Sequence, residues 1–169
     1  MATMIEIRDE RPADIAAIRD VNRLAFAQDQ EANIVDALRA NGGSLLSLVA
    51  TLDGEVVGHI MYSPLTVTAA TGAALGPMAV LPERQRQGIG SRLVAEGNRR
   101  LANAGCPFVV VLGHAGFYPR FGFRPASAFG ISCEWNVPDE VFMAVMLDDA
   151  KRPDIAGIAR YRAEFSTVS

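Results

Sequence analysis

The chain has 169 residues, half of them apolar, and a formal net charge of −3 at neutral pH. That length predicts a single domain large enough to bury a core, and the negative charge argues against a nucleic-acid binder, which needs a basic surface. No run approaches the ~18 uncharged apolar residues of a membrane span, and no basic-then-apolar leader opens the sequence. We therefore expect a soluble, cytoplasmic protein without nucleic-acid or membrane partners.

The sequence contains two cysteines, Cys106 and Cys133. They show neither a Cys-x-x-Cys pattern nor the spacing of metal ligands. We expect each to be a small buried apolar residue, and we expect no metal site.

The N-terminal third predicts a strand followed by two helices. Residues 4–8 alternate as in a strand, and Pro12 suits an early helical turn. Apolar residues then recur at helical spacing to about Phe26. A second helix is expected from about Glu31 until Asn-Gly-Gly at residues 41–43 stops it.

The clearest hairpin follows, with strands over residues 45–52 and 55–62 joined by Asp53-Gly54. Asp-Gly is a strong signal for a two-residue turn. Pro64 interrupts the second strand because proline removes a donor from the ladder; residues 65–67 extend it after a bend, and residues 68–73 are expected to form a loop. His59 lies in this strand, where a histidine is more often a packing residue than a base.

The chain is organised around residues 75–101, an apolar run of strand length, a glycine-containing turn and a segment with helical spacing. The N-terminus of a helix leaves N–H groups unpaired at the positive end of its dipole. Gly88 and Gly90 lack side chains and would let a ligand approach those amides closely, so phosphate is the expected ligand. The alternative is an ordinary glycine-rich turn capped by Ser91.

The spacing distinguishes this turn from two other phosphate motifs. A Walker loop would end in Gly-Lys-Ser/Thr, and a dinucleotide fingerprint would need a glycine where Leu93 stands. The pattern Gln85-x-x-Gly88-x-Gly90 resembles the acyl-CoA pyrophosphate loop of the GCN5-related N-acetyltransferases.

A second stretch resembles the same family. Residues 108–112 are apolar throughout and predict a central strand parallel to its neighbour, so that residues 75–112 form a βαβ unit. Tyr118-x-x-x-Gly122-Phe123 follows, which is similar to the family's tyrosine-bearing short helix. The wider phrase Gly-His-x-x-Phe-Tyr-Pro-Arg-Phe-Gly-Phe resembles one poorly characterised bacterial branch. The sequence departs from many members in having no acidic residue over residues 75–81.

The C-terminal part predicts two further strands, over residues 129–135 and 141–147. The second is apolar on both faces and should be internal. We expect one N-acetyltransferase domain over residues 1–147 and a tail over residues 148–169, with a weak strand at 165–168. The tail is expected to pack on the domain or on a partner subunit of a homodimer.

The resemblance implies an α/β fold, a twisted mixed sheet of six or seven strands with about four helices. The strands that end at Val80 and Leu112 would be parallel neighbours that splay apart beside a bulge near residues 76–78. It also implies acetyl-CoA as cosubstrate, with pantetheine along Met78, Ala79 and Val80. The pyrophosphate would lie on the turn formed by Gln85, Arg86, Gln87, Gly88, Ile89, Gly90 and Ser91.

The implied activity is transfer of an acetyl group to a primary amine of a small molecule, an amino-acid derivative or a peptide. Tyr118, protonated at neutral pH, would be the acid that serves the leaving thiolate. Candidates for the base are His114, His59, Glu31 and a chain of water molecules, and none of them is favoured. The first two helices would lie beside the acceptor, with Phe26, Gln28 and Glu31 as possible contacts.

Two other functions stay open at this point. A catalytically silent CoA-binding sensor would keep the loop, although the presence of Tyr118 argues against it. A nucleotide-phosphate binder unrelated to CoA is disfavoured by the missing Walker lysine. The acceptor itself is not fixed by the motifs, because one fold serves many substrates.

Overall fold

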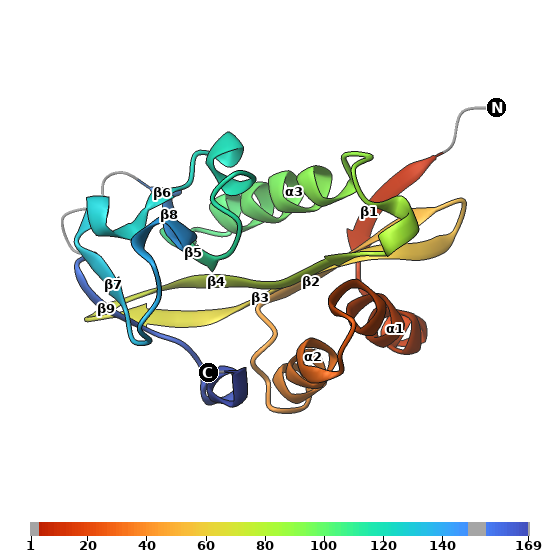
Figure 1. Ribbon diagram of the computed structural model, residues 1–169, viewed down its shortest axis with the longest axis horizontal. Coiled ribbons are helices and arrows are strands. Elements are labelled where there is room, and N and C mark those ends of the chain that lie inside the picture. The colour runs from red at the N-terminus through yellow and green to blue at the C-terminus, as the bar shows by residue number, and fades with distance from the viewer. Residues whose placement is uncertain (1–3, 149–154, 169) are drawn as a thin grey trace. The chain divides into compact units, whose positions relative to one another are not determined.

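The computed structural model describes residues 4–148 and 155–168. Three α-helices and nine strands lie in these residues, joined by turns and short 3-10 helices (Figure 1). The expected α/β class with a mixed sheet is confirmed. The strand count exceeds six or seven because two strands have only two and three residues. The helical turns expected at Pro12 and Tyr118 are 3-10 rather than α-helical.

The described residues form two compact units. The first comprises residues 4–62 and 77–97 with Val168, and the second comprises residues 63–76, 98–148 and 155–167. Two strands and one α-helix contribute residues to both units, namely β3 (Glu55–Val67), β4 (Ala70–Val80) and α3 (Ile89–Asn103).

The first unit contains an antiparallel arrangement of β1 (Ile5–Asp9), β2 (Leu46–Leu52) and β3. The predicted hairpin is confirmed, because Leu52 pairs with Glu55 across Asp53 and Gly54. Both turn residues have positive φ, 51° and 88°, as a type I′ turn requires. The predicted helices are α1 (Ile15–Phe26), preceded by a 3-10 turn at Pro12–Asp14, and α2 (Gln30–Ala40).

In the first unit, α1 and the first half of α3 lie on opposite faces of β3 (Figure 1). A Cβ atom on Gly58 would point at Ile89 and Leu93 of α3, 3.1 Å from each. The next residue, His59, contacts Asn22 of α1. Successive residues of a strand point to opposite faces, so Gly58 and His59 define the two sides.

In the second unit, β4 pairs with β5 (Phe108–Leu112) in parallel, as expected. β5 pairs on its other side with β8 (Phe142–Met146), which also pairs with β6 (Arg124–Pro125). β8 is therefore internal, as its two apolar faces predicted. β7 (Ile131–Cys133) pairs with β9 (Gly157–Arg160), which in turn pairs with Thr66 and Val67 of β3.

The parallel pairing of β4 with β5 covers only Ala73, Ala74 and Leu75. β4 nevertheless continues to Val80 and β5 to Leu112. Gly76, the next residue, has φ 150°, a conformation that residues with a Cβ atom rarely adopt. The ladder thus ends at a residue whose backbone departs from regular strand geometry.

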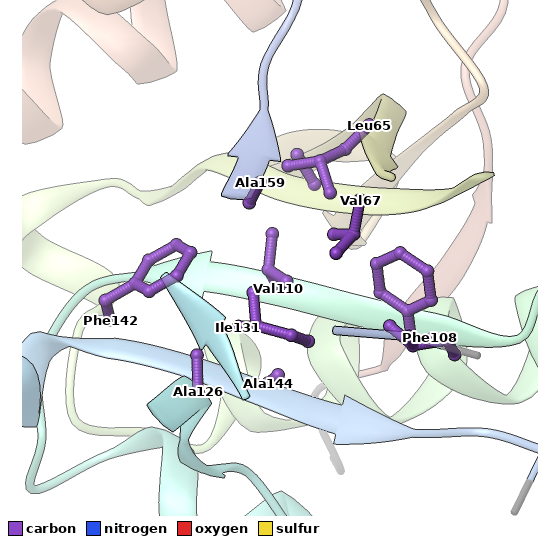
Figure 2. Close-up of a cluster of buried hydrophobic side chains, with 11 residues drawn as sticks. Leu65, Val67, Phe108, Val110, Ala126, Ile131, Phe142, Ala144 and Ala159 are labelled. Atoms are coloured by element: carbon purple, nitrogen blue, oxygen red, sulfur yellow. The ribbon is translucent and has the colours of Figure 1, made fainter. Parts of the chain in front are cut away.

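The core of the second unit is built from apolar side chains of its strands (Figure 2). Leu65, Val67, Phe108, Val110, Phe142, Ala144 and Ala159 all belong to this cluster. Ile155 and Ala159 are fully buried in it, so residues beyond position 148 contribute to the packing of this unit.

Some sequence predictions are wrong in detail. β3 runs through Pro64 without interruption. Its pairing with β2 ends at Tyr62 and its pairing with β9 begins at Thr66, so Pro64 lies between these two ladders. Residues 70–73 belong to β4 rather than to a loop. A loop was predicted because residues 70–73 are small. In the structure, a small residue is needed in the strand at Gly72, where the aromatic ring of Phe108 packs directly against it.

The C-terminal predictions also need correction. Residues 163–168 form a 3-10 helix instead of a strand, while the strand β9 was not foreseen. Of the strand expected over residues 129–135, only Ile131–Cys133 is extended, after a 3-10 turn at Ala126–Phe129. Residues 149–154 and 169 of the predicted tail lie outside the described residues. Within the described residues, no helix has the length and apolar character needed to cross a membrane.

Both cysteines are free thiols and only half-buried. Burial raises the pKa of each thiol, which keeps both protonated at neutral pH. Their surroundings are therefore those of packing residues, although less enclosed than expected.

Candidate active site

The connection between β4 and α3 has the backbone shape of an anion site. A 3-10 turn at Pro82–Arg84 follows β4, and α3 begins at Ile89. Between them, Arg86 has φ 66° and Gly88 has φ 83°. Left-handed residues that alternate with right-handed ones turn successive N–H groups toward one side and form a concavity that binds anions.

The first turn of α3 adds unpaired amides to this concavity. The first bond of the turn runs from the Arg92 N–H to the Gly88 carbonyl, 3.1 Å, so the amides of Ile89, Gly90 and Ser91 precede it. These amides carry the positive end of the helix dipole. Gly88 is exposed, and a Cβ atom built on it would meet no protein atom within 4 Å. Because α3 begins at Ile89, Ser91 lies inside its first turn and is not its cap.

The loop is tethered at both ends. The Gln85 side-chain amide donates to the Val80 carbonyl, 3.0 Å, and the Leu81 N–H donates to the Val57 carbonyl of β3, 2.9 Å. Ile89, the first residue of α3, is 2% exposed. The Gln85 side chain is therefore engaged in holding the loop to the end of β4, and the side chains of Arg86 and Gln87 are exposed.

The last residues of β4 offer backbone groups more than side chains. Ala79 and Val80 are 3% and 8% exposed, and Met78 is half-buried. The side chains of Ala79 and Val80 are thus buried, so a ligand along these two residues would meet mainly main-chain atoms.

Tyr118, in the second unit, lies just beyond β5 at the start of a 3-10 helix, Tyr118–Phe121. Its N–H donates to the His114 carbonyl, 3.3 Å, and its ring makes edge contacts with Phe117 and Phe123 at centroid distances of 5.0 and 5.6 Å. The ring also covers Gly113, where a Cβ atom would lie 3.3 Å from Tyr118 Cδ2. Tyr118 is 6% exposed, and burial raises its pKa to about 12. The hydroxyl is therefore protonated at neutral pH.

The three candidate side-chain bases lie in very different surroundings. His59 is 0% exposed, and burial lowers its pKa to about 4. Glu31 accepts two hydrogen bonds from the Gln28 amide, 3.0 and 3.1 Å, at the start of α2. His114 is exposed in the turn after β5. Burial removes His59 from contact with any substrate, whereas Glu31 and His114 stay accessible.

His59 belongs to a buried polar relay that the sequence did not predict. Its Nδ1 lies 3.3 Å from Asn22 Nδ2 and its Nε2 lies 2.9 Å from Ser47 Oγ. Ser47 Oγ donates to Glu10 Oε1 at 2.7 Å. The Arg39 guanidinium donates to both Glu10 carboxylate oxygens, at 2.8 and 2.9 Å. The only available signal was a polar residue, Asn22, at an apolar position of α1.

The relay contains serine, histidine and glutamate but is not a hydrolytic triad. In such a triad the carboxylate orients the histidine and the histidine activates the serine. Here Ser47 lies between His59 and Glu10, and its hydroxyl donates to the carboxylate. The serine oxygen is therefore not activated as a nucleophile.

A hollow of about 300 Å³ lies at the connection from α1 to α2. Arg23, Leu24, Ala27, Gln28 and Asp29 line it, and Arg23 Nε pairs with Asp29 Oδ1 at 2.8 Å. Phe26 beside it is 37% exposed. Among the residues that the structure describes, no cluster of three or more His, Cys, Asp or Glu side chains is arranged to hold a metal ion.

Comparison with known proteins bears on this geometry. Residues 44–125 match the family model of the acetyltransferase (GNAT) domain. The N-acetyltransferase YhbS of Escherichia coli is 34% identical over 163 residues, which cover 95% of this chain and 98% of YhbS. The chain belongs to the GCN5-related N-acetyltransferase (GNAT) family. The enzyme class expected from the sequence, an acyltransferase, is thereby confirmed.

Other GNAT relatives agree. The N-acetyltransferase YjhQ of Escherichia coli is 38% identical over 135 residues, 76% of this chain and 75% of YjhQ. The crystal structure of Escherichia coli YhbS in complex with CoA has a TM-score of 0.94 at 33% identity and covers 98% of this chain and 94% of that chain. A GNAT acetyltransferase from Brucella melitensis in complex with acetyl-CoA has a TM-score of 0.80 at 38% identity, over 96% of this chain and 98% of that chain.

Proposed function

We propose that this GNAT protein transfers the acetyl group of acetyl-CoA to a primary amine of a small molecule, an amino-acid derivative or a peptide. The observation that carries the proposal is the left-handed turn at Arg86 and Gly88, which leads directly into the N-terminus of α3. The complexes of YhbS with CoA and of the Brucella melitensis enzyme with acetyl-CoA support it.

In this proposal the pyrophosphate of CoA lies on the backbone amides of Gly88, Ile89, Gly90 and Ser91. The amides are the natural donors because they precede the first hydrogen bond of α3 and lie at the positive end of the helix dipole. Gln85 holds the loop in place through its bond to the Val80 carbonyl. The guanidinium groups of Arg84 and Arg86 are close enough in sequence to meet the phosphate charge. The pantetheine arm follows the backbone of residues 78–80.

The reaction needs approximation more than side-chain chemistry. A neutral amine attacks the thioester carbonyl, a C–N bond forms, the C–S bond breaks and CoA leaves as a thiolate. Holding the two reactants together can correspond to effective molarities of ~10⁵ to 10⁸ M. The fold therefore contributes mainly by fixing the cosubstrate.

Three proton transfers complete the reaction. The leaving thiolate takes a proton from the Tyr118 hydroxyl, which burial keeps protonated. The nitrogen that has attacked loses a proton as the neutral amide forms, and a proton returns to the Tyr118 oxygen to replace the one given to the thiolate. The attacking ammonium group must first lose a proton, and Glu31, His114 and a chain of water molecules are the acceptors that the geometry leaves open. His59 is not among them, because its ring is buried and both nitrogens are occupied.

The proposal is tested by release of CoA thiol from acetyl-CoA in the presence of a panel of primary amines. The panel contains alkyl diamines, amino-acid amides and short peptides. Amine-dependent thiol release establishes the enzyme. Tight CoA binding in calorimetry without turnover of any amine would instead favour the silent sensor.

The role of the loop is tested with Gly88→Val and a matched control, Gly42→Val. Both glycines have a left-handed φ, 83° and 73°, and neither has a protein atom within 4 Å of a built Cβ, so the two substitutions carry a similar backbone cost. Gly88→Val should lower CoA affinity at least tenfold, about 1.4 kcal/mol, and Gly42→Val should leave it unchanged. Equal affinities in calorimetry would remove the loop from the cofactor site.

A further inference from the structure

The hydrogen bonds of the relay in the first unit favour one arrangement of protons, in which Asn22 Oδ1 is buried without a hydrogen-bond partner. The Asn22 amide Nδ2 donates to the Ile18 carbonyl at 3.0 Å and faces His59 Nδ1, so Nδ1 is the acceptor. The proton of the neutral ring then lies on Nε2 and points to Ser47 Oγ. Ser47 has one hydroxyl proton, which goes to Glu10. The chain of donors therefore runs from Asn22 through His59 and Ser47 to Glu10.

This relay joins the two N-terminal helices to the strands beneath them. Asn22 comes from α1, His59 from β3 and Ser47 from β2. Arg39 of α2 holds the far end by its paired bonds to Glu10, which follows β1. A second set of bonds ties the helices to each other, since Asp36 of α2 accepts from Arg39 at 3.1 Å and from Arg19 of α1 at 2.8 Å.

A protonated imidazole would cost this relay one of its hydrogen bonds. A proton on Nδ1 would face the Asn22 N–H, which is a second donor. Turning the Asn22 amide would bring its oxygen toward the Ile18 carbonyl and break the bond given there. His59 is 0% exposed, so water cannot solvate the added charge.

Glu10 and Arg39, the charged groups at the far end of this relay, keep their charge in mildly acidic solution. Burial tends to raise the pKa of Glu10, but its bonds with Arg39 and Ser47 outweigh burial and hold the pKa below its usual range. The bond to Glu10 raises the pKa of Arg39. Beyond them lie Asp36 and Arg19, which pair with each other at 2.8 Å. Between neutral pH and pH 5, His59 is thus the group in this relay that responds to protons.

We propose that His59 is a positioning residue whose neutral imidazole holds α1 and α2 on β2 and β3, and whose protonation releases the helix pair. The consequence for activity rests on the proposed function, because the α1–α2 connection is where we expect the acceptor amine to lie. Acid would then weaken the acceptor side of the enzyme and spare the CoA loop, which lies on α3 at the opposite face of β3.

The test is hydrogen exchange of the full chain, followed by mass spectrometry at pH 7.5 and pH 5.0 and corrected for the intrinsic exchange rate. In the parent protein, the protection of peptides from α1 and α2 should be at least tenfold lower at pH 5.0 than at pH 7.5. The reason is that His59 binds a proton when the helix pair has left the strands but not when the pair is packed on them. His59→Gln keeps one donor and one acceptor but cannot be protonated in this range. Its loss of protection over the same interval should be less than threefold.

Ser47→Ala serves as a second variant, since it shortens the relay and leaves the imidazole in place. It should lower protection of α1 and α2 at both pH values and keep the acid response. Equal acid responses in the parent and His59→Gln, or no acid response in the parent, would overturn the proposal. Calorimetry with CoA at pH 7.5 tests the proposed function separately. If the parent protein does not bind CoA, the proposed function is refuted, whereas the hydrogen-exchange data test only the role of His59.

Discussion

Arg86 adopts a left-handed backbone conformation, φ 66°, that costs a residue with a Cβ atom roughly 1–2 kcal/mol. Strain of this kind persists where surrounding structure enforces it and is often associated with ligand sites. Arg86 is also exposed, so packing does not explain why a residue with a Cβ atom occupies this left-handed position. Either its amide or its guanidinium group could therefore be the part that serves a phosphate.

Arg86→Gly separates these two roles. If the amides bind the phosphate, the variant should keep CoA affinity within about threefold, which is under 1 kcal/mol. The free energy of unfolding should rise by about 0.5 kcal/mol, because relief of strain exceeds the entropy gained by the unfolded chain. Calorimetry and urea denaturation measure the two effects, with Arg86→Ala as the control that loses the guanidinium and keeps the strain. A tenfold loss of affinity in both variants would assign the binding to the guanidinium.

Tyr118 has its ring packed between Phe117 and Phe123 and its hydroxyl protonated at neutral pH. Tyr118→Phe keeps these ring contacts. If the hydroxyl protonates the leaving thiolate, kcat should fall by about 10- to 100-fold, because the lower end of the usual effect of a general acid applies to a fair leaving group. Affinity for acetyl-CoA should stay nearly constant.

Single-turnover kinetics check this expectation, because they isolate the chemical step from product release. A variant whose chemical step runs at the parental rate would leave Tyr118 as a packing residue only. In that case approximation of the two substrates would be the sole catalytic contribution we assign to named residues.

At the scale of single elements, the position of α3 depends on close approach to β3. Tyr62 of β3 is fully buried, and a Cβ atom on Gly97 of α3 would lie 2.7 Å from its Cζ. Gly58 plays the corresponding part under the first turn of α3, next to Ile89 and Leu93. Because these two glycines have no side chains, α3 can lie close to β3. The distance between α3 and β3 in turn fixes the position of the amides at the N-terminus of α3.

Gly97→Ala should therefore destabilise the protein. Alanine favours a helix by about 1 kcal/mol over glycine, but overpacking against a buried ring typically costs about 1–3 kcal/mol. We expect a net loss of about 1 kcal/mol in the free energy of unfolding, measured by urea denaturation. Ala95→Gly, at an exposed position of the same helix, measures the propensity difference by itself. An unfolding free energy that rises in Gly97→Ala would show that α3 can move away from Tyr62 without penalty.

At the scale of the whole molecule, the chain beyond residue 148 is part of the packed structure. β9 pairs with both β3 and β7, and the Thr68 hydroxyl donates to the Ala156 carbonyl at 2.7 Å. Ile155 is 0% exposed, whereas Ile158 is 44% exposed. The division into a domain of residues 1–147 and a separate tail stays a prediction, but the described tail residues supply core contacts of the second unit.

Two substitutions in this segment should differ sharply. Ile155→Ala should lower the free energy of unfolding by about 2–4 kcal/mol, because it removes buried methyl groups and leaves a cavity. Ile158→Ala, an equal change at an exposed site, should change it by less than about 0.5 kcal/mol. Thermal or urea denaturation of the two proteins decides the point. Equal effects would place Ile155 outside the cooperative core.

The sequence by itself determined the features that depend on neighbours in the chain. The Asp53-Gly54 hairpin, α1, α2, β5 and the glycine turn before α3 are confirmed, because turn chemistry and hydrophobic periodicity act over a few residues. The two spaced motifs at Gln85–Gly90 and Tyr118–Phe123 also sufficed for the family. The residues assigned to CoA binding and catalysis stay predictions, which the experiments above address.

Only the tertiary structure decided what depends on contacts between distant residues. Asn22 and His59 are 37 positions apart and Glu10 and Arg39 are 29 apart, and no local pattern links them. The same holds for β9, whose pairing with β3 cannot be predicted from periodicity, and for Pro64, which lies between the part of β3 that pairs with β2 and the part that pairs with β9. His59 illustrates the physical reason: whether an imidazole is a base or a fixed part of the core is set by its burial and by the partners of its two nitrogens, which come from α1 and β2.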